Sequence, residues 1–175
     1  IDEGELKKNI ARNVKVLPKP DLPKKQLSRY YTYDEIMRRY LGNQKQLKHL
    51  DISQNYIRVL PYRMQLLSKI ESLNFADNKL INISWLSGKW WSLKEIDVSG
   101  NETLETEGML INLSFMDNIE KLTISHLSVI PEQFKYFMGK ELVIKDSEIP
   151  EFPRHEYSSK INKITFDNCV FPDPG

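Results

Sequence analysis

Side chains that could carry out chemistry are few and scattered in this sequence. The three histidines, His49, His126 and His155, are far apart, and none has a partner at the spacing of a zinc ligand pair. The single cysteine, Cys169, excludes sites built from several thiolates. No stretch has the glycine spacing of a phosphate-binding loop or the G-x-S-x-G spacing of a nucleophilic serine. The sequence therefore predicts a protein that is not an enzyme, with no metal, no cofactor and no small-molecule substrate.

Apolar residues, by contrast, recur in a long repeated pattern. In the stretch LDISQNYIRVLP, apolar residues alternate at Leu50 and Ile52, and after Asn55 they are spaced by three or four. The clear copies are Leu47, Leu50, Ile52, Asn55 and Ile57; Ile70, Leu73, Phe75, Asn78 and Leu80; and Leu93, Ile96, Val98 and Asn101. Weaker copies are Ile119, Leu122, Ile124, Leu127 and Val129; Leu142, Ile144, Ser147 and Ile149; and Ile161, Ile164, Phe166, Cys169 and Phe171. At the second apolar position, successive copies lie 23, 23, 26, 20 and 22 residues apart, a period typical of stacked repeats.

This pattern resembles the leucine-rich repeat family, with its consensus L-x-x-L-x-L-x-x-N/C-x-L. The resemblance covers about residues 47 to 172, and the first copy has the spacing of the typical 23-residue class. Three positions depart from the consensus, because Leu127 and Ser147 stand where Asn is expected and Gly139 where the first Leu is expected. The resemblance implies an α/β solenoid, with a parallel β-sheet on its concave side and irregular or short-helical segments on its convex side.

The recurring Asn has a physical role in such a stack. After each short strand the chain must turn sharply, which leaves backbone polar groups facing the interior. An amide side chain both donates and accepts, so Asn55, Asn78 and Asn101 are expected to satisfy these groups as a buried ladder. Cys169 occupies the same position, which favours a structural cysteine over a reactive thiol.

The chain divides into three expected parts. Residues 1–31 form a basic, proline-containing arm, and residues 1–46 carry a net charge of about +5. Residues 32–46 contain a capping helix and linker, because Thr32 and Glu35 form a capping box before a helical apolar pattern. Residues 47–175 form the repeat domain of about six repeats, and its last strand has no candidate cap. We therefore expect more chain or a partner to cover the C-terminal end.

A solenoid of this kind offers the outward side chains of its strands as a binding surface. These side chains are polar, almost free of aromatic rings, and acidic in the first three copies, which fits a protein or peptide partner better than a nucleic acid. The predicted partner-binding residues are His49, Asp51, Ser53, Ser72, Asn74, Glu95, Asp97, Lys121, Thr123 and Lys145.

The basic arm supports an alternative function. A flexible basic segment suits RNA phosphates or an acidic protein groove. The candidate contacts are Lys15, Lys19, Lys24, Lys25 and Arg29. The main hypothesis is thus a protein-interaction module with a second contact through the arm. One alternative is a subunit of a ribonucleoprotein assembly, and another is the recognition fragment of a receptor or a longer enzyme.

The cysteine count and the glycosylation sequons bear on the compartment of the protein. There is no membrane span, and a single cysteine without disulfide caps favours an intracellular protein. The N-x-[ST] sequons at Asn82 and Asn112 keep an extracellular location possible, whereas Asn101 is a ladder residue expected to be buried.

The three tryptophans fall at two kinds of position in the repeat. Trp90 occupies a core position, while Trp85 and Trp91 fall at variable positions. If Trp85 and Trp91 are exposed, they would suit a protein partner.

Overall fold

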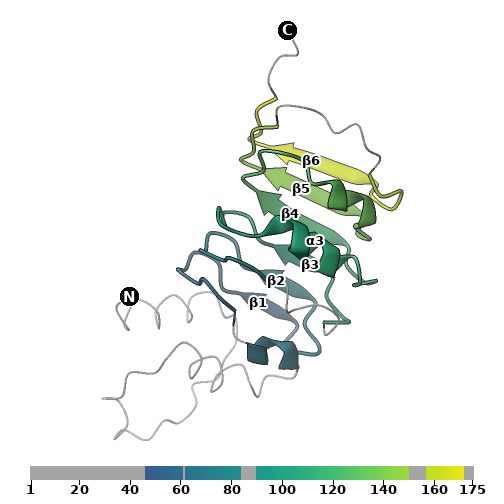
Figure 1. Cartoon of the computed structure of the whole chain (residues 1–175). Helices are drawn as coiled ribbons and strands as arrows, with labels where there is room; N and C mark the ends of the chain where they lie inside the picture. The colour runs from purple at the N-terminus through teal and green to yellow at the C-terminus, as the bar shows by residue number, and fades with distance from the viewer. Residues whose placement is uncertain (1–45, 61, 84–89, 150–156, 172–175) are drawn as a thin grey trace, which may run out of the picture.

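A computed structural model describes residues 46–60, 62–83, 90–149 and 157–171 of the chain. Each repeat contributes one short strand to a single six-stranded sheet with the order β1-β2-β3-β4-β5-β6, and every neighbouring pair is parallel (Figure 1). The strands are β1 (His49–Asp51), β2 (Ser72–Asn74), β3 (Glu95–Asp97), β4 (Lys121–Ser125), β5 (Glu141–Lys145) and β6 (Lys163–Asp167). The predicted parallel sheet, with one strand from each copy, is confirmed.

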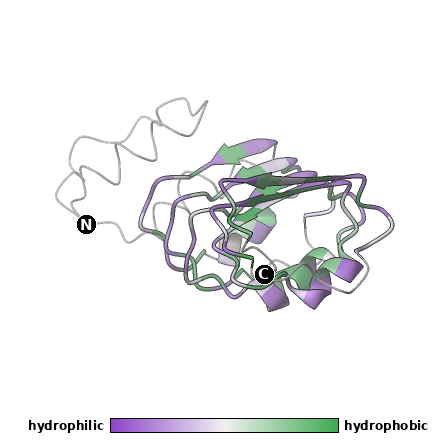
Figure 2. Cartoon of the chain, turned by 90° about the horizontal axis from the view of Figure 1, so that it is seen from above, coloured by the Kyte–Doolittle hydropathy of each residue, from purple (hydrophilic) through white to green (hydrophobic). Residues whose placement is uncertain are grey.

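The molecule has two layers. Figure 2 shows the sheet along one side and the returning segments, with their short helices, along the other. These helices are the 3-10 segments η2 (Tyr62–Leu66) and η4 (Glu132–Tyr136) and the α-helix α3 (Thr106–Leu113). Between the layers lies one apolar cluster, to which the first five copies contribute buried inward strand residues; Ile164 and Phe166 of the sixth copy pack against it and are partly buried.

Strand register follows from the repeat, because stacking identical turns aligns equivalent residues. His49 pairs with Ser72, Ser72 with Glu95, and Glu95 with Lys121. The inward residues Leu50 and Leu73 pair in the same way. A slip of one residue would turn the apolar side chains outward, so the buried face fixes the register.

A turn of constant geometry follows each strand. In all six copies the residue just before the ladder position has a positive φ: Gln54, Asp77, Gly100, His126, Asp146 and Asn168. One of the six is a glycine, and four others are Asp, Asn or His, the non-glycine residues most often found at positive φ; only Gln54 is of a type without that tendency. The left-handed residue bends the chain so that the next side chain points into the core.

The predicted asparagine ladder is confirmed. Asn78 is 1 % exposed, and its Nδ2 donates to Phe75 O in its own repeat and to Ile52 O in the preceding one, both at 3.0 Å. Asn101 makes the equivalent bonds to Val98 O at 2.9 Å and Phe75 O at 3.0 Å. Each of these two side chains therefore joins two repeats through buried hydrogen bonds.

The departures from the consensus have local explanations. Gly139 stands where the first Leu is expected because the buried ring of Phe137 fills that space; a Cβ on Gly139 would lie 2.4 Å from the ring. Ser147 replaces the ladder Asn, and its hydroxyl accepts from Leu127 N–H at 2.9 Å and donates to Lys145 O at 2.7 Å. Cys169 is partly buried, with Sγ 3.4 Å from Ile144 O, in keeping with a structural cysteine.

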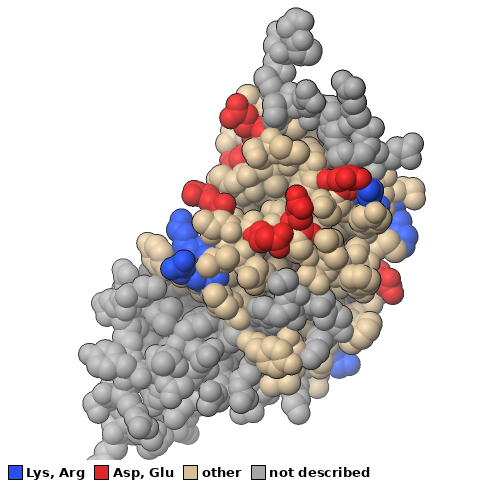
Figure 3. Space-filling view, in the orientation of Figure 1, with Lys and Arg blue, Asp and Glu red and all other residues tan. Residues whose placement is uncertain are grey.

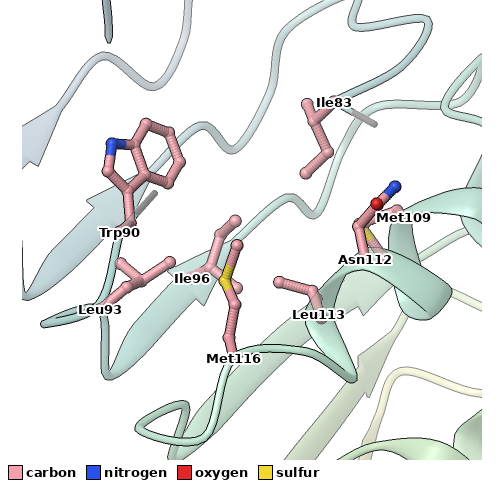
Figure 4. A pocket seen from close by; sticks show the side chains of 8 residues that line it. All are labelled: Ile83, Trp90, Leu93, Ile96, Met109, Asn112, Leu113 and Met116. Atoms are coloured by element: carbon pink, nitrogen blue, oxygen red, sulfur yellow. The ribbon is translucent and has the colours of Figure 1, made fainter. Parts of the chain in front are cut away.

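Helix α3 was not predicted. It lies in the third copy, which is three residues longer than its predecessors, and its N-cap Glu105 accepts from Gly108 N–H at 2.8 Å. Its buried residues Met109, Leu110 and Leu113 pack against the sheet. Figure 4 shows Leu113 and Met116 facing Trp90 around a void of about 10 Å³, the size of one water molecule at most. This void is an imperfection of packing in the core.

Residues 1–45, before β1, lie outside the described residues, and the last strand at the other end of the solenoid is only partly buried. The basic arm over 1–31 and the helix predicted to begin at Thr32 lie outside the described residues, as do Trp85 and His155. At the other end, Ile164 and Phe166 of β6 are only partly buried, whereas their counterparts Leu50 and Ile52 are fully buried. Cover for the C-terminal end stays a prediction.

Candidate functional site

The outward side of the sheet carries in-register rows of side chains, and we call it the strand face. Its first row runs through His49, Ser72, Glu95, Lys121, Glu141 and Lys163. Its second row runs through Asp51, Asn74, Asp97, Thr123, Val143 and Thr165. The predicted contacts Ser53 and Lys145 follow the second row at the ends of their strands and are partly buried. The tertiary structure thus brings all ten predicted partner-binding residues to one face.

Charge on the strand face is divided between its two halves. Across β1 to β3 the rows hold Asp51, Glu95 and Asp97, with His49 as the only basic side chain. Glu95 is exposed and has no hydrogen bond or ion pair with another described side chain. This half of the face therefore carries more negative than positive charge, although Lys94 and the cross-strand neighbour Lys121 lie close to Glu95.

Two of these carboxylates also hold the turns that follow their strands. Asp51 Oδ1 accepts from the backbone N–H of Ser53 at 2.9 Å, and Asp51 Oδ2 accepts from Asn74 Nδ2 at 3.1 Å. Asp97 Oδ1 accepts from the N–H and the hydroxyl of Ser99 at 2.9 and 2.6 Å. Asp51 and Asp97 thus have a structural role besides any binding role, and Glu95 is the acidic residue with no such role.

Across β4 to β6 the charges compensate one another. Glu141 lies between Lys121 and Lys163, at 3.8 and 2.7 Å. The hydrogen bond from Lys163 is the main reason that the pKa of Glu141 is lowered. Glu141 and Lys163 were not among the predicted contacts, although their alternating charges at the first strand position are visible in the sequence. This half of the face offers paired charges rather than a field of one sign.

One predicted contact residue lies on the strand face but is buried. Thr123 is only 5 % exposed, because it sits between Asp97 and Val143 in neighbouring strands. Ser99, Ser125 and Val143 are likewise buried on this face. Thr123 lies in the middle of the sheet with a strand on each side, so it supplies little binding surface.

The edge where the strands begin carries a second group of charges. Glu71 lies between Lys48 at 2.7 Å and Lys94 at 3.0 Å. The hydrogen bonds from Lys48 and then Lys94 lower the pKa of Glu71 to about 2. An open cleft of about 440 Å³ lies nearby, lined by Lys94, Asp117, Asn118, Ile119, Glu120, Met138, Lys140, Lys160 and Asn162. Since Lys94 pairs with Glu71 and Lys140 with Glu120, the cleft is not a strongly basic site.

In the described part of the chain, side chains that could act in catalysis or hold a metal ion do not form a cluster. Ser125 Oγ lies 2.7 Å from His126 Nδ1, but the same hydroxyl accepts from Gly100 N–H at 2.7 Å, and no described carboxylate contacts the His126 ring. Across the described residues, no three His, Cys, Asp or Glu side chains come together to hold a metal ion. The helices in that part of the chain are all too short or too polar to span a lipid bilayer.

Comparison with known proteins identifies the architecture. No protein-family model matches the chain, and no curated protein sequence matches it. Among solved structures it is similar to an internalin F of Listeria monocytogenes, with 16% identity, a TM-score of 0.50, and coverage of 76% of this chain and 45% of that one. It also matches an internalin C2 of the same organism, with 13% identity, a TM-score of 0.49, and coverage of 72% of this chain and 64% of that one.

Internalins are leucine-rich repeat proteins. With its six parallel strands and its ladder, the fold of this chain is a leucine-rich repeat solenoid. The chain matches less than two thirds of the length of either internalin. At this level of identity the likeness concerns the fold.

Proposed function

We propose that this chain belongs to the typical 23-residue class of leucine-rich repeat proteins and binds a protein partner through the strand face. The observation that supports this most directly is the excess of negative charge on the half of that face across β1 to β3. A rigid sheet that holds carboxylates in register loses little conformational entropy when a partner docks. A partner with basic side chains at matching positions would be oriented and attracted by these charges.

Other ligands fit this face less well. Nucleic acid binding needs Lys and Arg along the phosphates, but the acidic half repels phosphate, and Lys121 and Lys163 of the other half pair with Glu141. A metal-dependent or catalytic role would need convergent polar groups that the described part of the strand face does not bring together. We therefore retain the hypothesis of a non-enzymatic module, which remains a prediction.

The charge of Glu95 provides the sharpest test. Glu95→Lys reverses one charge on β3, the last strand of the acidic half, and leaves the turn-holding bonds of Asp51 and Asp97 in place. Glu102→Lys makes the same charge change outside the strand rows, at an exposed residue after the ladder position of the third copy. Both variants are compared with the wild type by quantitative mass spectrometry of proteins that co-purify from the native source.

We expect Glu95→Lys to lose a partner that the wild type and Glu102→Lys both retain. That partner's affinity for purified wild-type and variant protein is then measured at low and high salt, since a charge-steered contact weakens as salt rises. If the wild type and Glu95→Lys retain the same proteins with the same affinity, the strand face is not the binding surface.

The ribonucleoprotein alternative depends on residues outside the described ranges. Its candidate contacts, Lys15, Lys19, Lys24, Lys25 and Arg29, all lie in the arm. Salt-sensitive RNA binding that is lost on deleting residues 1–31 would support it, because phosphate contacts release counterions. RNA binding that survives the deletion would exclude the arm as the site. The intracellular location likewise stays a prediction, and occupancy of the sequon at Asn82 in native protein would contradict it.

A further inference from the structure

A second candidate surface lies on the side of the molecule opposite the strand face. Trp91 and Phe115 are 69 % and 65 % exposed, far more than core aromatic residues. They line one small pocket together with Trp90, Met116, Asp117 and Asn118. Trp91 precedes β3 and Phe115 follows α3, so the fold brings together two aromatic side chains that are 24 positions apart in the sequence.

The pocket is held by well-anchored backbone. Trp90 is buried and its indole Nε1 donates to Met64 O at 3.0 Å, so its neighbour Trp91 is directed outward. Asn118 Nδ2 donates to Trp91 O, which ties the turn after α3 to the Trp90–Trp91 segment. Within that turn, Met116 N–H donates to Leu113 O at 3.0 Å. The two aromatic residues are therefore mounted on a fixed frame, which lowers the entropic cost of binding.

The chemistry of the lining selects a cation. Aromatic faces carry negative electrostatic potential and attract ammonium or guanidinium groups. Asp117 adds a carboxylate to the wall, exposed and without an ion pair to another described residue. The C-terminal end of α3, just before Phe115, contributes partial negative charge. Figure 3, which views this side, shows acidic side chains both near its centre and toward its margins, with the basic ones toward the margins.

The size of the pocket limits what can enter it. Its volume is about 40 Å³, and since one water needs roughly 10–15 Å³ on this measure, it holds about three water-sized groups. That matches the head of one basic side chain and is too small for a folded segment. We propose that this pocket binds a basic side chain, arginine above all, presented by a protein partner, as a contact separate from the strand face.

The test uses the full chain, labelled with ¹⁵N, and two isosteric probes. N-acetyl-L-arginine amide carries the guanidinium, and N-acetyl-L-citrulline amide has nearly the same shape without the charge. We expect the arginine probe to shift the Trp91 indole and Asn118 amide signals in a saturable manner, with the citrulline probe about fivefold weaker or more. Asp117→Asn, which preserves shape, should weaken the arginine probe by a similar factor, and Trp91→Ala should abolish the shifts at Asn118.

The control is Tyr56→Ala, which removes another exposed aromatic side chain outside the pocket and should leave binding unchanged. The proposal would be overturned if both probes bound equally well, if Asp117→Asn bound the arginine probe as tightly as the wild type, or if no saturable shift appeared. Concentration-dependent shifts of the same signals without any probe would also overturn it, since they would assign the pocket to a second copy of the chain. Asp117→Asn and Trp91→Ala each change an exposed side chain. Unperturbed signals from core residues show that each variant is folded.

Discussion

Asn78 Oδ1 accepts a hydrogen bond from the backbone N–H of Ile57 at 3.0 Å, across 21 residues of sequence. The same side chain donates to Ile52 O and Phe75 O, so one residue satisfies buried backbone groups in two adjacent repeats. Asn101 repeats the arrangement with Leu80 N–H at 3.0 Å. The ladder is therefore a connection between repeats as well as a support for each turn.

Removing one step of the ladder should destabilise the protein strongly. Asn78→Ala leaves buried backbone donors and acceptors without partners, and we expect a loss of about 2–4 kcal/mol in the free energy of unfolding. Urea unfolding followed by circular dichroism measures it. Asn82→Ala, at an exposed asparagine four residues away, should change stability little. Equal effects of the two substitutions would show that the ladder bonds contribute nothing.

The turn before the ladder residue has a strict requirement at one position. Gly100 has a φ of 69°, and a Cβ there would lie 2.1 Å from Asp77 Oδ1 and 2.8 Å from Asp77 N. Gly100→Ala should therefore cost about 1–3 kcal/mol through backbone strain and the clash. Gly108→Ala is the matched control, because its Cβ would meet only the flexible carboxylate of Glu105 and helix propensity favours Ala. Thermal unfolding of the two variants should separate them clearly.

Stability should fall in acid through Glu71. Its pKa is lowered from 4.5 to about 2 by hydrogen bonds from Lys48 and then Lys94. Because the folded pKa is below the unfolded one, the stabilisation is complete above about pH 4.5 and is lost as pH falls towards 2. Urea midpoints measured between pH 6 and 2 should decline less steeply for Glu71→Gln than for the wild type. Glu102→Gln should follow the wild-type curve, and a parallel decline in Glu71→Gln would contradict the assignment.

Packing of α3 against the sheet is tested by two positions on that helix. Leu113 is buried and lines the same void as Trp90 and Leu93 (Figure 4), whereas Ile111 is exposed. Leu113→Ala should lower the free energy of unfolding by about 2–5 kcal/mol, through lost burial and the enlarged void. Ile111→Ala should cost well under half as much. Similar losses would mean that α3 does not contribute to the common core.

The repeat was predictable from sequence because its period is written in large apolar residues. Leu50, Ile52 and Asn55 recur with their spacing intact in the second and third copies, so the sheet, its register and the ladder follow from pattern alone. In the later copies the sequence showed where consensus residues are missing, but not what takes their place. That Phe137 fills the space of the missing Leu at position 139 depends on the direction of a ring two positions away, which spacing does not encode.

Helix α3 and the left-handed turn residues escaped the sequence analysis for different reasons. The extra residues of the third copy showed an insertion, but its helical form depends on Leu110 and Leu113 finding room against the core. The positive φ at Gln54 is imposed by the turn, whereas Asp77 is of a type that is enriched at positive φ. The sequence thus held a signal for this turn position, but the search for apolar periodicity did not use it.

For the candidate surfaces, the residues that alternate outward from the strands could be read from the sequence, because strand periodicity is two and the inward set is apolar. Which of them are available depends on the fold. Thr123 is buried in the middle of the sheet, Asp51 and Asp97 are engaged in their own turns, and Glu141 pairs with two lysines, while Glu95 is exposed and makes no hydrogen bond to another described side chain. The fold also places Trp91 beside Phe115 in one pocket. Burial and pairing depend on neighbours a whole repeat away, and those neighbours exist only once the repeats are stacked.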